Sequence, residues 1–267
     1  MDTSVLTIKG DRSGIILVSV YKPNIYLKPY VKCYWSLQST DHGGVAERKY
    51  LLSDSGMKIS FNLADPVEFD IKGSNLLGVP EACLIGPSTH NFWLQASGRL
   101  NRFGIQFRPG GAYPFISIPA YELRDKIIEL ETILGNSGQL LMRRIQNPKQ
   151  TTKDRIQILE KFLMQKLERS CHCDSAFDFA KDTILTYRGL MVIEQLSRAM
   201  HISNRKLERN FNQKVGIPPK LFAGSYVFAI FSIILPNIPT PAGYLLRLTV
   251  GTIINPISFV ISLFSQD

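Results

Sequence analysis

The first half of the chain alternates between short apolar runs and turn-forming clusters. The clusters include His42-Gly43-Gly44 and Pro109-Gly110-Gly111. Strand-like runs, rich in β-branched and aromatic residues, lie between such turns at Ile15–Val20, Met57–Leu63, Val67–Ile71, Phe92–Ala96 and Phe103–Phe107. Several short strands separated by turns predict a small β-sandwich or barrel.

The second half shows helical periodicity. An amphipathic helix is predicted over Asp154–Arg169, with Ile158, Phe162 and Leu167 near one stripe. This helix either packs on its own domain or serves as a dimer helix. The segments on both sides of it, residues 147–152 and 170–175, have the composition of linkers.

Three further helices are predicted in succession. The first spans Asp174–Tyr187 and directs Phe177, Ala180, Ile184 and Leu185 inward, and Gly189 ends it. The second, Leu190–Ala199, is expected to place four residues in the same core, namely Met191, Val192, Leu196 and Met200.

The third helix follows a short turn. Ser203 is a suitable N-cap, Gly216 a suitable stop, and Pro218 a suitable restart. Ile202, Leu207 and Phe211 share its buried stripe, which leaves a polar face consisting of Arg205, Glu208, Arg209 and Asn212.

These patterns together predict an α+β protein. A β-rich domain with a C-terminal helix covers residues 1–165, and a linker covers residues 166–175. A helical unit covers residues 176–223, and an apolar tail covers residues 224–267.

The composition agrees with a globular protein of two domains. Of 267 residues, 45% are hydrophobic and 20% are charged, and the formal net charge is +9. This charge suits a polyanion-binding protein and also an ordinary basic one. Four scattered cysteines and a polar N-terminus without a signal peptide predict reduced thiols and a cytoplasmic location.

The turn and the third helix, taken together, carry a family pattern. Ser203, Arg205, Leu207, Arg209, Phe211, Gly216 and Pro218 resemble the first helix-turn-helix of the AraC/XylS family of bacterial transcription regulators. The second helix of such a motif lies in the DNA major groove. The resemblance therefore implies double-stranded DNA as the partner, with a recognition helix at residues 203–215.

Candidate DNA-binding residues follow from this helix. Arg205 and Arg209 suit bidentate contacts to guanine, while Asn204 and Lys206, next to the cap Ser203, suit phosphates or base edges. An alternative is that Arg209 pairs with an acid of its own domain.

The N-terminal half resembles the DUF6597-type domain of a subset of AraC-type regulators. The resemblance rests on Tyr34-Trp35, Phe61-Asn62-Leu63, Gly86-Pro87 and above all the segment Gly104–Ala112, and it runs through most of residues 20–170. In that family the domain senses a signal or dimerises, which implies a small-molecule effector or a homodimer without naming either.

Two residues of this half are candidates for ligand binding. Tyr34, Trp35 and Leu37 are expected on a core or pocket wall, and Trp35 serves either packing or a ligand. Arg108, before Pro-Gly-Gly, either clamps an anion or hydrogen-bonds turn carbonyls to hold the loop.

Other chemistry is not expected. Cys171-His172-Cys173 lacks a second pair at zinc spacing, so a linker with incidental cysteines is favoured over a metal site. No nucleophile with a base and no cofactor motif is found in the β-rich half, so no enzyme is expected.

The family pattern ends abruptly at Ala223. Residues 224–267 contain one basic residue, Arg247, and one acid, Asp267, although the family continues with a linker helix and a second helix-turn-helix. Codons read in a shifted frame permit Arg-Ile-Ile-Arg-Phe-Arg over Ala223–Ala229. In the same frame Val250–Asp267 permits Gly-Tyr-Tyr-Asn-Gln-Ser-His-Phe-Ile-Arg-Asp-Phe, close to the second unit.

We therefore hypothesise a single-base frameshift near the Ala223 codon. The apolar runs of the tail are shorter than the roughly 20 residues of a spanning helix and are cut by prolines, which favours a non-membrane protein. The leading hypothesis is an AraC-type regulator impaired by loss of its second unit. The alternative is a ligand-sensing or protein-interacting remnant without useful DNA binding.

Overall fold

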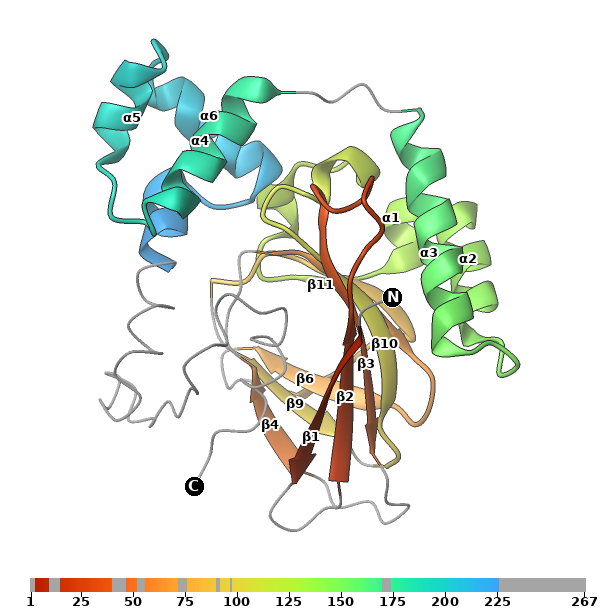
Figure 1. Ribbon diagram of the computed structural model, residues 1–267. Coiled ribbons are helices and arrows are strands. Elements are labelled where there is room, and N and C mark those ends of the chain that lie inside the picture. The colour runs from red at the N-terminus through yellow and green to blue at the C-terminus, as the bar shows by residue number, and fades with distance from the viewer. Residues whose placement is uncertain are drawn as a thin grey trace.

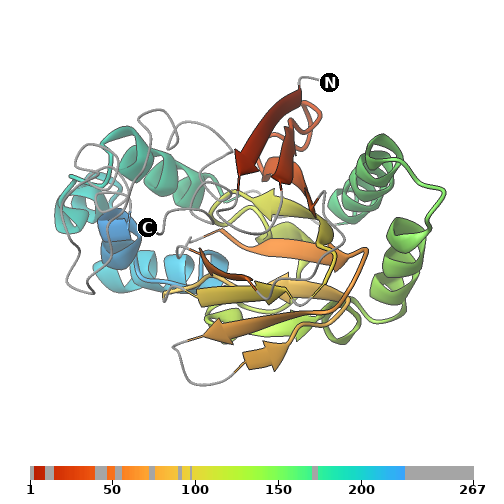
Figure 2. The ribbon, with the colours of Figure 1, turned by 90° about the horizontal axis from the view of Figure 1, so that it is seen from below.

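The protein has an α+β fold in which two antiparallel sheets are followed by helices. The structure is a computed structural model that describes residues 3–9, 15–39, 47–51, 56–71, 76–89, 92–96, 98–169 and 174–225. Helices α1–α3 lie on one side of the sheets and helices α4–α6 on the other (Figures 1 and 2).

The larger sheet has seven strands in the order β1-β2-β3-β10-β5-β8-β11. All its pairs are antiparallel. The strands span β1 (Thr3–Lys9), β2 (Ile15–Tyr21), β3 (Val31–Ser39), β5 (Lys58–Asn62), β8 (Ala82–Ile85), β10 (Asn101–Phe107) and β11 (Ile127–Glu129).

The smaller sheet has four strands in the order β4-β9-β6-β7. They span β4 (Glu47–Leu51), β6 (Val67–Ile71), β7 (Leu76–Gly78) and β9 (Phe92–Ala96). The five predicted strands are confirmed as β2, β5, β6, β9 and β10. The other strands were not individually predicted.

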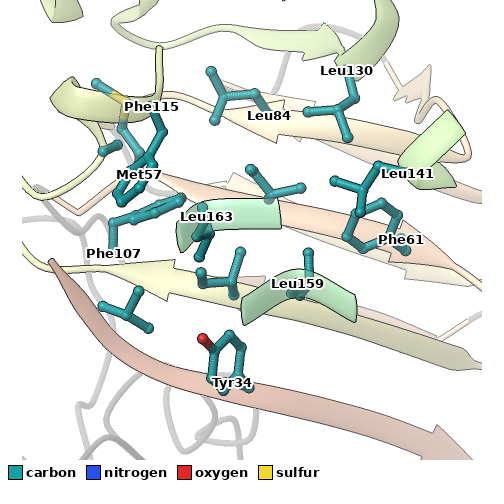
Figure 3. Close-up of a cluster of buried hydrophobic side chains, with 14 of the residues drawn as sticks. Tyr34, Met57, Phe61, Leu84, Phe107, Phe115, Leu130, Leu141, Leu159 and Leu163 are labelled. Carbon is teal, nitrogen blue, oxygen red and sulfur yellow. The ribbon is translucent and has the colours of Figure 1, made fainter. Parts of the chain in front are cut away.

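Side chains along β10 point alternately to the two faces of the larger sheet, and this places apolar residues on one of them. Phe103, Ile105 and Phe107 point to the same side, and all three are buried. On this side strand residues such as Tyr34 and Phe61 lie against Leu159 and Leu163 of α3 (Figure 3).

Three helices and two 3-10 turns complete the N-terminal part. They are η1 (Tyr113–Phe115), η2 (Ala120–Leu123), α1 (Leu130–Leu134), α2 (Asn136–Gln146) and α3 (Thr152–Leu167). Helix α3 begins with a capping box, in which Thr151 and Asp154 bond each other's backbone N–H.

Helix α3 packs on its own domain, as one of its two predicted roles required. Its most buried residues are Ile156, Leu159 and Leu163, and Ile158 is also buried. The predicted stripe was wrong in part, because Phe162 and Leu167 are only half-buried at the edge of the contact.

The C-terminal part contains α4 (Ser175–Thr186), α5 (Ile193–Ala199) and α6 (Asn204–Lys214), and residues 219–225 are also helical. The second predicted helix began too early. Gly189 has φ +76° and α5 starts only at Ile193, so the inward position belongs to Ile193, whereas Val192 is 50% exposed.

Cys33 and Cys83 are buried free thiols. In the described part of the chain, no helix combines the length and the apolar character needed to cross a bilayer. Residues 226–267 of the tail, and Cys171-His172-Cys173, lie outside the described residues.

Candidate nucleic-acid interface

Helices α4, α5 and α6 pack around one apolar cluster. Its centre is Phe211, whose ring lies 5.3 Å from that of Phe177 and 5.6 Å from that of Phe222. Leu196 and Leu207 complete the contact between α5 and α6. The prediction of Phe177, Leu207 and Phe211 as core residues is confirmed.

A tight turn joins α5 to α6. His201 in this turn has φ +54°, a left-handed conformation that reverses the chain between the two helices. Ser203 then caps α6, because its Oγ accepts the Lys206 N–H at 3.2 Å. The predicted start of the third helix is confirmed.

The first two turns of α6 present charge to solvent. Leu207 and Phe211 are buried, and the spacing between them fixes the rotation of the helix. As a result Arg205, Lys206 and Arg209 are exposed. The five predicted DNA-binding residues thus lie together at the start of α6.

These three cations have no ion pair within the described residues. Other cations of this region do: Lys214 Nζ lies 2.7 Å from Asp174, and Lys220 Nζ lies 2.8 Å from Glu194. The Lys220 contact lowers the pKa of Glu194 and raises the pKa of Lys220. The alternative in which Arg209 pairs with an acid of its own domain gains no support from these contacts.

Asn204 differs from its neighbours because its side chain is already engaged. Its Oδ1 accepts a hydrogen bond from the hydroxyl of Ser197, a buried residue of α5. This bond ties the start of α6 to the preceding helix. The amide NH₂ of Asn204 remains available as a donor.

The C-terminal end of α6 docks on the N-terminal part of the protein. Arg124, just after η2, donates from Nε to the Gly216 carbonyl at 2.6 Å and from Nη2 to Asn212 Oδ1 at 3.2 Å. Gln213 Nε2 donates to the Tyr113 hydroxyl at 2.9 Å.

Gly216 lies within this contact. It has φ +89°, and a Cβ atom there would come within 2.5 Å of Pro87 Cγ and 2.8 Å of the Ala120 carbonyl oxygen. The predicted outward position of Asn212 was wrong, because its side chain accepts a hydrogen bond from Arg124 in the same contact. The docked η2 segment half-buries that side chain, which helical periodicity alone could not indicate.

The two candidate ligand residues lie elsewhere. Trp35 is buried in β3 with its ring against Gly104, where an added Cβ would come within 2.4 Å of the ring. Arg108 is exposed, and its Nε donates to the Lys28 carbonyl at 2.8 Å. This geometry matches the loop-holding alternative for Arg108.

Sequence reasoning missed the residues of the docked contact. Nothing in the spacing around Arg124 or Tyr113 distinguishes them from other surface residues, because their partners lie on α6, about ninety to a hundred residues further along the chain. Buried polar residues between the two sheets, including Arg102, were also missed.

The N-terminal part matches a known family model. Residues 19–129 match the model described as "Domain of unknown function (DUF6597)". This confirms the resemblance of the N-terminal half over those residues. A comparison with curated proteins found no match.

Solved structures offer distant similarity. The AraC-like transcriptional activator CuxR is 10% identical, with 86% of this chain and 87% of that chain covered and a TM-score of 0.37. HppE in its Fe(II) form is 9% identical, with 40% of this chain covered and a TM-score of 0.30. An RmlC-like cupin from Shewanella frigidimarina NCIMB 400 is 10% identical, with 40% of this chain and 94% of that chain covered and a TM-score of 0.27.

The match to HppE spans 57% of the length of that protein.

Proposed function

We propose that this protein is a DNA-binding transcription regulator of AraC type, with α5 and α6 as a helix-turn-helix. Helix α6 would lie in the major groove with its N-terminal half toward the bases. The observation that carries the proposal is the exposed cationic start of α6, whose Arg205, Lys206 and Arg209 have no ion pair among the described residues.

The roles of the individual residues follow from their geometry. Arg205 and Arg209 are the candidates for bidentate contacts to guanine, one helical turn apart. Lys206 suits a phosphate oxygen as a point charge. Asn204 uses its oxygen on Ser197, so its free NH₂ donors suit a phosphate better than an adenine edge, which requires both groups.

The N-terminal domain would supply the input of the regulator. Its match to the DUF6597 model supports a role shared with that family, and the proposal assigns it signal sensing or dimerisation rather than catalysis. A cytoplasmic, bacterial protein is implied by the proposed function.

The sequence after Ala223 limits the proposed function. If residues 224–267 are out of frame, one helix-turn-helix of two is lost, and specific affinity falls by several kcal/mol out of a usual gap of about 4–10 kcal/mol over nonspecific binding. Sequencing the source DNA across the Ala223 codon and measuring the intact mass of the protein test this. A restored frame predicts an ordinary two-unit regulator.

Salt-dependent binding to duplex DNA tests the function itself. Selection from random duplexes should enrich a site, and the binding constant should fall with salt by about 0.9 log unit per phosphate contact for each tenfold increase. The double variant Arg205→Ala/Arg209→Ala should lose the enriched site. The matched control Arg143→Ala/Arg144→Ala removes the same charge from exposed positions on α2 and should keep the site.

Equal binding by the two double variants would remove α6 from the interface. Absence of any enriched site, together with an intact mass that includes the tail, would favour the alternative of a sensing or protein-interacting remnant.

A further inference from the structure

The inner face of the larger sheet carries polar residues where a core is expected. Antiparallel partners share a face, and the register places three rungs on this side. The rungs are Cys33, Gln106, Lys58 and Ile85; then Trp35, Gly104, Ser60 and Cys83; then Leu37, Arg102 and Asn62.

The second sheet covers this face. The Arg102 guanidinium lies 5.4 Å from the centroid of the Phe69 ring, and Phe69 belongs to β6 of the smaller sheet. We name Lys58, Ser60, Cys83, Arg102 and Gln106 the inner polar cluster. All five are buried, and Arg102 and Lys58 are each 2% exposed.

Arg102 is the centre of the cluster. Its Nε and Nη2 both donate to Ser60 Oγ, at 3.2 and 2.7 Å. Its Nη1 is buried and has no hydrogen-bond partner within the described part of the chain. The ring of Phe69 and the hydroxyl of Ser60 are neutral, so these contacts leave the positive charge uncompensated.

Burial works against this charge. It lowers the pKa of Arg102 and raises the pKa of the neighbouring Cys83 thiol, although Arg102 opposes the latter effect. Arginine nevertheless keeps its proton in proteins, so the cation cannot escape by neutralisation as a lysine can. A buried cation that keeps its charge requires an anion.

We propose that the inner polar cluster binds the carboxylate of a small organic molecule, with Arg102 Nη1 and the hydroxyl of Ser60 as donors. A planar carboxylate matches the donors of a guanidinium. Lys58, two positions before Ser60 on β5, lies buried on the adjacent rung.

The surroundings also indicate the body of the ligand. Trp35, Leu37 and Phe69 are buried on or against the same face, at 3–5% exposure. Ligand sites combine such apolar walls with a few placed polar groups. The site therefore suits a carboxylate on an apolar or aromatic body. Its use as the signal of a regulator rests on the proposed function, whereas the binding itself does not.

Thermal unfolding of the full chain tests the site. Sodium acetate, benzoate and phenylacetate are the probes, and sodium chloride and neutral benzamide are the controls. At about ten times its dissociation constant, a bound carboxylate should raise the unfolding temperature by about 3–6 °C, while the controls leave it unchanged.

Variants then assign the effect to Arg102. Arg102→Met should abolish the shift and, without a probe, unfold no lower than the wild type, because an apolar side chain replaces a buried charge. Arg99→Met removes an arginine that is exposed near the start of the same strand, and it should keep the shift. If Arg102→Met does not fold, Arg102→Lys decides: it should bind benzoate at least about tenfold more weakly.

Three results would overturn the proposal: no shift with any of the three carboxylates, an equal shift in Arg102→Met, or unchanged benzoate affinity in Arg102→Lys. DNA is absent from all these measurements, so their failure is distinct from failure of the proposed regulator function.

Discussion

The two ends of α6 meet different surroundings. At the start of the helix, Arg205, Lys206 and Arg209 face solvent without ion pairs among the described residues. At its end, Asn212, Lys214 and the Gly216 carbonyl are all engaged by groups of the same protein. One end is thus bonded to groups of the same chain, while the other presents its charge to solvent.

The buried middle of α6 holds both ends of the helix in place. A substitution there should have the largest effect on stability. Phe211 is fully buried between Phe177 and Phe222, so Phe211→Ala should lower the free energy of unfolding by about 3–5 kcal/mol. Urea unfolding followed by circular dichroism measures this. Phe179 on α4 is 58% exposed, so the control Phe179→Ala should change the free energy of unfolding by less than about 0.5 kcal/mol. Similar effects of the two substitutions would contradict the packing described.

Single substitutions separate the charges at the start of α6. On an enriched duplex, Arg209→Ala should cost about 1–3 kcal/mol of binding and relax the preference at one base pair. Lys206→Ala should weaken binding to all sequences and reduce the salt slope by about 1. Glu208→Ala removes an acid from the same exposed side and should strengthen binding. Weaker binding by the Glu208 variant would place this side of the helix away from the DNA.

A substitution at Arg124 tests the contact between the C-terminal end of α6 and the N-terminal part. Arg124→Met removes both hydrogen bonds to Asn212 and Gly216, which should weaken the contact between the two parts by about 1–2 kcal/mol. Amide hydrogen exchange should rise at residues 212–216 and stay constant at Leu207. Lys126→Met, an exposed neighbour, is the matched control. Unchanged exchange in the Arg124 variant would show that the contact adds no stability.

Acid should slightly weaken the contact between the start of α4 and the end of α6. Burial alone would raise the pKa of Asp174, but hydrogen bonds from Lys214 and from the Phe177 N–H lower it below its usual value. A lowered folded-state pKa contributes stability above the unfolded value of about 3.9, and this is lost as pH falls through the folded value.

Asp174→Asn isolates this charge because asparagine also caps helices. The variant should lose about 0.5–1 kcal/mol at pH 7, a modest figure since the Asp174 side chain is 34% exposed and solvent screens the pair. Between about pH 5 and pH 3, its stability should fall less than that of the wild type. Parallel pH profiles of the two proteins would exclude the ion pair as the cause.

The sequence predicted α6 well because its determinants are local. The cap Ser203, the spacing of Leu207 and Phe211, and the stop Gly216 all act within one helix. The docked contact could not be predicted in this way, since Arg124 and Asn212 meet only through tertiary structure. Helical periodicity places Asn212 outward, and a second part of the chain then covers it.

Strand periodicity is insufficient in a similar manner at Arg102. Residues Asn101–Phe107 alternate between apolar and polar, which is the pattern of a strand with one face in solvent. The pattern correctly indicates Phe103, Ile105 and Phe107 as the core face. It misplaces Arg102 and Gln106, because the smaller sheet buries the polar face as well.

Gly216 has a consequence for how this position can vary. A helix stop with φ +89° would tolerate asparagine, which adopts left-handed conformations more readily than other side chains. Here a Cβ atom would meet Pro87 and the Ala120 carbonyl. Related chains that keep this docked contact should therefore have only glycine at this position. Related chains in which the helical unit does not contact the N-terminal part should also accept asparagine there. In an alignment of related sequences, the residue aligned with Gly216 would thus indicate whether the helical unit contacts the N-terminal part.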